Sequence, residues 1–302
     1  MKKVIITGIG GFIGAALGRK MLELGYTICG IDILENPAVT SLKQHRNFNF
    51  ICSEYEKYES IDVAHDFDFF IHAAWAGVHG SDYNSTVSQI GNIKGSISAI
   101  NLCKRVSCPN FMFIDSSHEY QKNINLKKEI GFCSIYGSAK KAARSMLESI
   151  SHNLEINLYC VAFTNVYGPG DYSYRSTNVI IESLFNKGQA DLIEGNNLHD
   201  WTYIDDAVNG MIAVCKNGNP NTMYYIGSRS LLSFKEIIFK VRSVVNPSSL
   251  LNFGKYNDTS FIDYSFFNLN KLYEDTGFEC CFSVEEGTNK TLNWLKKIGR
   301  IK

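Results

Sequence analysis

The sequence predicts an α/β fold in which a doubly wound parallel sheet is followed by a smaller α+β part. Three observations predict this fold. Short β-branched runs alternate with helical stretches through the first half of the chain, which is typical of a parallel sheet with helices on both faces. These runs are apolar throughout, as expected where both faces of the sheet are covered. After Asn165 the alternation ends, and a turn-rich segment leads into shorter elements.

The expected elements follow in chain order. In the first part we expect strands at residues 4–7, 27–32, 48–52, 68–72, 110–115 and 157–163, with helices at 12–24, 85–106 and 135–152. In the second part we expect helices at 175–187, 205–215, 234–245 and 284–297, and a short strand at 201–204. The predicted division is a dinucleotide-binding domain over residues 1–165 and a mainly substrate-binding domain over 166–302, with segments near 200–227 returning to the first domain.

Composition and charge exclude several classes of protein. The chain has 302 residues, of which 45% are apolar and 20% charged, which is an ordinary globular mixture. Its 30 basic residues balance its 30 acidic ones, whereas a nucleic-acid-binding protein is usually basic. We find no apolar run as long as a membrane span and no signal peptide, so a cytoplasmic protein is expected. The nine cysteines form no C-x-x-C pair, so we expect reduced thiols and no metal site.

A glycine-rich turn gives the sharpest local signal. It runs from Thr7 to Gly14, directly after the first expected strand, and opens the first helix. Gly8 allows a tight turn, Gly11 allows close approach of a pyrophosphate, and Gly14 allows close packing of helix on strand. The first helical residues, Phe12 and Ile13, then offer free backbone N–H groups to the phosphates.

Asp32 ends the second expected strand, at the spacing that a dinucleotide fold uses for its ribose-binding acid. A carboxylate there accepts hydrogen bonds from the adenosine ribose and repels a 2′-phosphate. No Arg or Lys lies between Asp32 and Thr40 to offset that repulsion. The sequence therefore favours NAD over NADP as the cofactor.

Tyr136 and Lys140 lie one helical turn apart at the start of the helix that follows the fifth strand, which itself ends in Ser116. Ligands of doubly wound sheets bind near the carboxyl ends of the strands, where these residues are expected. Hydride transfer at a carbinol carbon needs a proton transfer at its oxygen. A tyrosine can serve if a nearby ammonium and the nicotinamide charge lower its pKa from about 10. A serine hydroxyl can orient the substrate oxygen.

Taken together, these motifs resemble the extended short-chain dehydrogenases/reductases with a Rossmann-type fold, the NAD-dependent epimerase/dehydratase family acting on nucleotide sugars. The resemblance covers nearly the whole chain. It rests on the glycine turn, Asp32, the 72–74 segment (His-Ala-Ala), Ser116, Tyr136 with Lys140, and the segments 165–170 (Asn-Val-Tyr-Gly-Pro-Gly) and 200–206 (Asp-Trp-Thr-Tyr-Ile-Asp-Asp).

The resemblance implies a role for each matching residue. Tyr136 would be the general acid/base, Lys140 would lower its pKa and hold the nicotinamide ribose, and Ser116 would polarise the substrate oxygen. The remaining positions are binding residues: Ala73 and Ala74 for the cofactor, and Asn165, Ser117, His199 and Lys255 for the substrate. His72 matches the motif, but we interpret it as a structural histidine beneath the cofactor.

Departures from the family pattern indicate which of the family's reactions to expect. The acid pair that 4,6-dehydratases carry directly after the Ser/Thr is replaced here by Ser117 and His118. Many members of the family carry an arginine at the position of His199, so the contacts with the diphosphate of the nucleotide sugar are expected to be unusual. The short chain and the 20-residue spacing of Ser116 and Tyr136 resemble 4-keto-6-deoxyhexose reductases of surface-polysaccharide pathways.

The sequence therefore leads to an NAD(P)-dependent 4-keto sugar reductase, with two alternatives. One is an NAD-dependent nucleotide-sugar 4-epimerase using the same residues. The other, from a different class, is a non-catalytic dinucleotide-binding sensor or scaffold. The expected partner is a nucleotide-diphosphate sugar, with no nucleic acid and no membrane. A homodimer is also expected, because the helices near 85–106 and 135–152 resemble the dimer bundle of the family.

Overall fold

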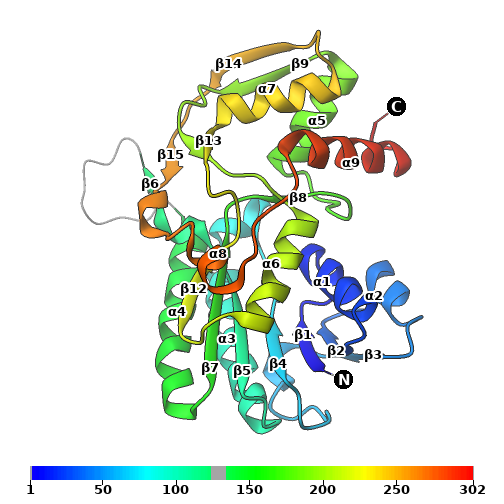
Figure 1. The fold of residues 1–302 in the computed structure, drawn as a ribbon, viewed down its shortest axis with the longest axis vertical. Helices are drawn as coiled ribbons and strands as arrows, with labels where there is room; N and C mark the ends of the chain where they lie inside the picture. Colours follow the sequence, from blue (N-terminus) through cyan, green and yellow to red (C-terminus); the bar gives the residue numbers. More distant parts are fainter. Residues whose placement is uncertain (1, 124–133, 302) are drawn as a thin grey trace.

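A seven-stranded parallel sheet forms the lower part of the molecule in Figure 1. The computed structural model describes residues 2–123 and 134–301. The strand order is β12-β7-β5-β4-β1-β2-β3, and the order reverses between β1 and β4. The strands are β1 (Lys3–Thr7), β2 (Thr27–Asp32), β3 (Phe48–Cys52), β4 (Phe69–His72), β5 (Asn110–Ser116), β7 (Asn157–Phe163) and β12 (Thr222–Tyr225). The sheet confirms the predicted doubly wound α/β fold.

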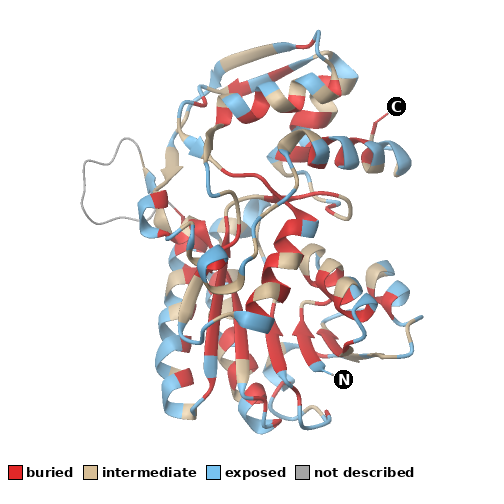
Figure 2. Cartoon of the chain, in the orientation of Figure 1, coloured by how far each residue is buried: buried red, intermediate tan, exposed pale blue. Residues whose placement is uncertain are grey.

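Helices cover both faces of this sheet. One face carries α1 (Phe12–Glu23), α2 (Pro37–Leu42) and α6 (Ile204–Asn217), and the other carries α3 (Thr86–Arg105) and α4 (Ile135–Leu154). Alternate residues of a strand point to opposite faces, so Val4 and Ile6 pack with Leu17 of α1 while Ile5 packs with Ala99 of α3. Figure 2 accordingly shows the central strands buried along most of their length.

The second part of the molecule lies beyond the carboxyl ends of the strands, at the top of Figure 1. Its helices are α5 (Ser176–Lys187), α7 (Phe234–Val245), α8 (Lys271–Thr276) and α9 (Val284–Lys297), of which α8 lies lower, beside β12. Its strands pair as β9 (Gln189–Ile193) with β14 (Leu250–Tyr256), β10 (Leu198–His199) with β13 (Leu232–Ser233), and β11 (Thr202–Tyr203) with β8 (Val166–Tyr167). The described residues also form four short 3-10 helices: η1 (Tyr55–Lys57), η2 (Gly80–Asn84), η3 (Ser117–Tyr120) and η4 (Tyr264–Phe266).

Two features join the parts. One apolar cluster contains both Leu17 of α1 and Ile238 of α7, so the core is continuous between them. In addition, β15 (Ser260–Ile262), late in the chain, pairs antiparallel with β6 (Gln121–Asn123), which follows β5. Within the described ranges, no helix is long and apolar enough to cross a membrane.

Candidate active site

The glycine turn has the geometry that a dinucleotide needs. Gly8 has a φ of +70°, and a Cβ on it would lie 2.6 Å from the backbone nitrogen of Ala74 and 2.7 Å from the carbonyl carbon of Ala73. A Cβ on Gly14 would lie 2.1 Å from the Gly8 carbonyl oxygen. Side chains at these two positions would therefore collide with backbone. Ala73 and Ala74 lie against the turn, as the sequence predicts.

The start of α1 is open to a phosphate. Gly11 is the N-cap and makes no side-chain cap, while its own N–H donates to the Gly8 carbonyl at 3.0 Å. Phe12 and Ile13 are the first two helical residues, whose N–H groups have no partner within a helix. The helix dipole favours an anion at this end. These residues fit the pyrophosphate of a dinucleotide.

Asp32 is fixed at the end of β2. Its carboxylate accepts hydrogen bonds from the backbone N–H groups of Gly10 and Ile33, each at 2.8 Å. Burial raises the pKa of Asp32, and the two backbone donors oppose that rise. Asn36 also binds the turn, because its side-chain nitrogen donates to the Gly10 carbonyl at 2.9 Å. The carboxylate thus stands beside the glycine turn, where an adenosine ribose is expected.

Ser116, Tyr136 and Lys140 come together at the carboxyl end of β5. Ser116 ends the strand, and Tyr136 and Lys140 lie in the first two turns of α4. The Lys140 ammonium donates to the Ile114 carbonyl at 2.7 Å and lies 3.6 Å from the centroid of the Trp75 ring. All three predicted catalytic residues are buried, with exposures of 6%, 8% and 3%.

Burial dominates the electrostatics of Tyr136 in the chain alone. Burial raises the pKa of Tyr136 to about 12, and a hydrogen bond from the Ser116 hydroxyl opposes the rise. The Lys140 ammonium lies 6.0 Å from the centroid of the Tyr136 ring. Lowering of this pKa by Lys140 together with the nicotinamide charge stays a prediction. Burial likewise lowers the pKa of Lys140.

A buried ion cluster lies beneath Lys140, and the sequence analysis missed it. The guanidinium of Arg144 lies 3.1 Å from the Asp115 carboxylate and 2.9 Å from the Glu119 carboxylate. Both acids are almost fully buried, and burial raises the pKa of Asp115. Arg144 follows Lys140 by one helical turn, which was the available signal, but nothing in the local sequence shows that Asp115 and Glu119 face it.

A cleft of about 550 Å³ opens beside Ser116 and Tyr136. Predicted substrate residues Asn165 and His199 line it. The side-chain amide of Asn165 donates a hydrogen bond to the Thr177 hydroxyl at 2.9 Å. Burial lowers the pKa of His199. Its remaining described lining residues come from segments far apart in the sequence: Val78, His79, Tyr83, His118, Gln121, Thr164, Tyr174, Arg175, Ser176, Ile193, Trp201, Phe234 and 257–262.

Two predicted substrate residues lie elsewhere. Ser117 is fully buried and its hydroxyl does not reach the cleft surface. Lys255 is exposed on β14 and is not among the described lining residues. The structure instead brings Arg175 to the cleft, where it is the one Arg or Lys among the described lining residues. Arg175 lies in the turn before α5, and we know of no sequence signal that would have identified it.

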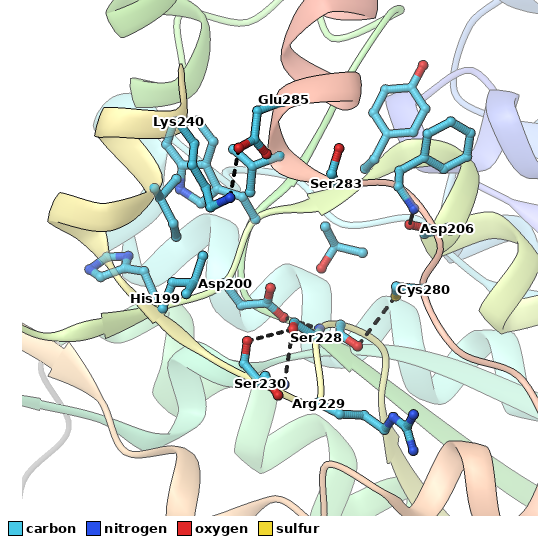
Figure 3. Close-up of a pocket in the computed structure, with 18 of the residues that line it drawn as sticks. His199, Asp200, Asp206, Ser228, Arg229, Ser230, Lys240, Cys280, Ser283 and Glu285 are labelled. Carbon is cyan, nitrogen blue, oxygen red and sulfur yellow. Dashed lines mark hydrogen bonds and ion pairs between the residues drawn. The ribbon is translucent and has the colours of Figure 1, made fainter. Parts of the chain in front are cut away.

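A second, smaller pocket shares His199 and Trp201 with the cleft (Figure 3). Its volume is about 370 Å³. Its charged groups are paired: Lys240 with Glu285 at 2.7 Å, and Asp200 with the backbone N–H of Ser228 at 2.9 Å. Burial raises the pKa of Asp200 to about 6. The described lining of this pocket includes none of the three predicted catalytic residues.

Comparison with known proteins decides the family. The model of the NAD dependent epimerase/dehydratase family matches residues 4–227. The chain belongs to this family. The predictions of the family, of an enzyme and of NAD as cofactor are thereby confirmed.

Relatives match along nearly the whole chain. Protein CapI of Staphylococcus aureus is 24% identical, over 97% of this chain and 98% of its own. A UDP-glucuronate 4-epimerase of Thermodesulfobacterium geofontis is 25% identical, over 97% and 96%. The solved UDP-glucuronic acid 4-epimerase of Bacillus cereus, in complex with NAD, has a TM-score of 0.79 at 21% identity, over 99% and 98%. A dTDP-glucose 4,6-dehydratase of Bacillus anthracis reaches the same TM-score at 19% identity, over 98% and 97%.

Proposed function

We propose that the protein is an NAD-dependent oxidoreductase acting at carbon 4 of a nucleotide-linked sugar, and that it works as a 4-epimerase. The observation that carries this proposal is the meeting of Ser116, Tyr136 and Lys140 at the carboxyl end of β5, where Ser116 and Tyr136 line a cleft of about 550 Å³. The sequence analysis favoured a 4-keto reductase over the epimerase. We now prefer the epimerase because two of the relatives above are named UDP-glucuronate 4-epimerases.

Each residue has a defined task in this reaction. Tyr136 accepts the proton of the 4-hydroxyl group and later returns it, and Ser116 holds the same oxygen by a hydrogen bond. Lys140 supplies a positive charge that favours the phenolate as the tyrosine gives up its proton. NAD, when bound, supplies hydride acceptance and return at carbon 4. Gly8, Gly11, Gly14 and Asp32 would hold it.

The test separates epimerase from reductase. Purified protein is incubated with NAD and, in turn, UDP-glucuronate and UDP-glucose, and the products are resolved by NMR. We expect the 4-epimer to form without accumulation of NADH. A reductase would give no epimer and would consume NADH in equal amounts with a nucleotide-linked 4-keto sugar. Turnover of neither substrate class, despite NAD binding, would leave a non-catalytic binding protein as the conclusion.

A further inference from the structure

The buried ion cluster beneath Lys140 contains two acids and one base, and the proposed reaction gives it no task. The Arg144 guanidinium of α4 contacts the carboxylates of Asp115, in β5, and Glu119, in η3. The side chains of both acids are 0% exposed, and that of Arg144 is 15% exposed. One guanidinium cannot balance two carboxylates. The three side chains therefore carry one excess negative charge when both acids are ionised.

The hydrogen bonds of the two carboxylates leave part of this charge unsatisfied. Oδ1 of Asp115 accepts the backbone N–H of Ser116 at 2.8 Å. Oε1 of Glu119 is buried and accepts no hydrogen bond from any residue in 2–123 or 134–301. A buried charge is costly unless an opposite charge lies nearby. The two acids therefore need a second positive charge besides Arg144.

Lys140 is placed to be that second charge. It precedes Arg144 by one turn of α4, and its ammonium donates to the carbonyl of Ile114, the residue before Asp115 in β5. Burial lowers the pKa of Lys140, whereas Asp115 and Glu119 oppose that lowering because they favour the charged form. With Lys140 included, two cations balance two carboxylates.

Other titratable groups around Lys140 carry no charge at pH 7. Burial lowers the pKa of His72, on β4, to about 3, with a smaller contribution from Lys140 itself. Burial raises the pKa of Tyr136, on α4, to about 12. Burial also raises the pKa of Cys160, on β7 beside Asp115, well above its ordinary value. The two carboxylates are therefore the negative charges that act on Lys140.

We propose that Asp115 and Glu119 are positioning residues that act through Lys140: with Arg144 they form a buried counter-charge that keeps the Lys140 ammonium protonated beside Tyr136. This rests on the proposed function, since the charge of Lys140 matters for a tyrosine that exchanges a proton with the sugar. Arg144 in turn holds the two acids, and so ties β5 and η3 to α4. Loss of either carboxylate leaves an excess positive charge, which is relieved when Lys140 releases its proton.

The test follows the charge of Lys140 directly, so that it does not depend on turnover. The full-length protein is labelled with ¹³C at the ε carbon of lysine and titrated with NMR detection, and Lys140→Arg assigns the signal. Glu119→Gln and Asp115→Asn keep the shape of each side chain and remove its charge. Each should lower the pH at which Lys140 loses its proton by about 1–3 units, the usual effect of one nearby opposite charge.

Two further variants separate charge from packing. Glu148 contacts the same Arg144 guanidinium at 2.6 Å, but its side chain is 51% exposed. Glu148→Gln is therefore the matched control, and it should leave the titration of Lys140 unchanged because solvent screens an exposed charge. Arg144→Lys alters the contacts but keeps the charge balance, so it should also leave the titration near that of the parent.

Several outcomes would overturn the proposal. They are an unchanged Lys140 titration in either buried acid variant, an equal shift in Glu148→Gln or Arg144→Lys, and a Lys140 amine that is already neutral at pH 6 in the parent. In single-turnover hydride transfer, the alkaline limb of the pH profile should move down with the Lys140 titration. Shifted titrations without epimerisation of any UDP-sugar would contradict the proposed function alone.

Discussion

His72 is a buried histidine near the candidate active site. His72 ends β4, with Nδ1 at 2.7 Å from the Thr7 hydroxyl and Nε2 at 3.1 Å from the Ser96 hydroxyl. Burial lowers its pKa to about 3, with a smaller contribution from the Lys140 charge. Because both ring nitrogens lie within hydrogen-bond distance of protein hydroxyl groups, these contacts support the interpretation of His72 as a structural histidine.

His72 predicts a dependence of stability on pH. Between pH 6.5 and about 3 the unfolded chain binds a proton at His72 and the folded chain does not, so this contribution to stability is lost as the pH falls. The slope should approach ~1.4 kcal/mol per pH unit for this one group. We expect His72→Gln to be less stable at pH 7 but to lose less stability between pH 6 and pH 4.5. Urea unfolding at several pH values measures this, and equal slopes would contradict it.

Tyr136 carries the main catalytic prediction. Tyr136→Phe removes one oxygen and leaves the ring contacts with Tyr83, Trp75 and His118 in place, so the fold and NAD binding should be kept. Turnover should fall by about 10²–10⁴-fold, which is ~3–5 kcal/mol of barrier. Single-turnover hydride transfer measures it. A fall of less than about threefold, ~0.7 kcal/mol, would show that Tyr136 is not the acid/base.

Lys140→Ala serves as the comparison for that variant. It should lower turnover and also weaken NAD binding, because the ammonium is predicted to hold the nicotinamide ribose. Calorimetric titration with NAD would distinguish the two variants.

The position of Asp32 predicts that the protein prefers NAD(H) to NADP(H). Its carboxylate, held by the N–H groups of Gly10 and Ile33, should favour NAD(H) over NADP(H) by repelling the 2′-phosphate. Asp32→Ala should lower NAD affinity by the loss of charge-assisted hydrogen bonds, about 1.5–3 kcal/mol, and reduce the preference. Calorimetric titrations of both cofactors measure this. Tighter binding of NADPH by the unmodified protein would overturn the assignment.

At the scale of elements, two glycine-to-alanine variants should change stability in opposite directions, one at the start of α1 and one in α3. Gly14→Ala places a Cβ 2.1 Å from the Gly8 carbonyl oxygen, so backbone must shift. We expect a loss of about 1–3 kcal/mol of stability, typical of overpacking, together with weaker NAD binding. Gly91→Ala in α3 is the matched control. The nearest atom to its Cβ is the Tyr55 hydroxyl at 3.6 Å, so the better helix propensity of alanine should stabilise by up to ~1 kcal/mol.

The elements that the sequence predicts are those with strong local patterns. The six strands expected in the first part and the long helices agree with the structure to within one or two residues at most ends. The expectations missed β12, and with it the seventh strand of the sheet, because Thr222–Tyr225 is short and its pairing with β7 is long-range. They also missed the β9–β14 and β6–β15 pairs for the same reason.

The site divides in the same way. Gly8, Asp32, Ser116, Tyr136 and Lys140 follow from spacing within one strand–turn–helix unit, so a sequence reveals them. The partners that tune them come from other elements. Arg144 pairs with Asp115 across 29 residues, and Tyr83 meets His118 across 35. Such pairs depend on how helices pack on the sheet, which the local pattern does not determine.

At the scale of the whole molecule, the cleft lies where the two parts meet. The first part supplies Ser116 and Tyr136, and the second supplies Arg175 and Asp258. The division near residue 165 stays a prediction, as do the cytoplasmic location and the homodimer. The described faces of α3 and α4 carry exposed apolar residues, namely Val87, Ile90 and Met146. A second copy packed on these helices would remove them from water.

Ligands bound at the junction should stabilise the whole molecule. The continuous apolar cluster joins the sheet to the second part, so we expect one cooperative unfolding transition. A ligand that binds only the folded chain adds about 2.7 kcal/mol at 100 times its dissociation constant. NAD and UDP should each raise the unfolding temperature. Because they occupy different parts of the site, their effects on the free energy of unfolding should add.

One variant distinguishes the two ligands. Arg175 is the one Arg or Lys among the described lining residues of the cleft, and its guanidinium donates to the Val166 carbonyl at 3.2 Å. None of those described lining residues belongs to the glycine turn that is expected to hold NAD. Arg175→Ala should therefore reduce the shift produced by UDP and leave the shift produced by NAD unchanged. A differential thermal unfolding series with NAD, UDP and both together measures this. If Arg175→Ala kept the full UDP shift, the nucleotide phosphates would bind elsewhere, and the placement of the substrate in this cleft would have to be abandoned.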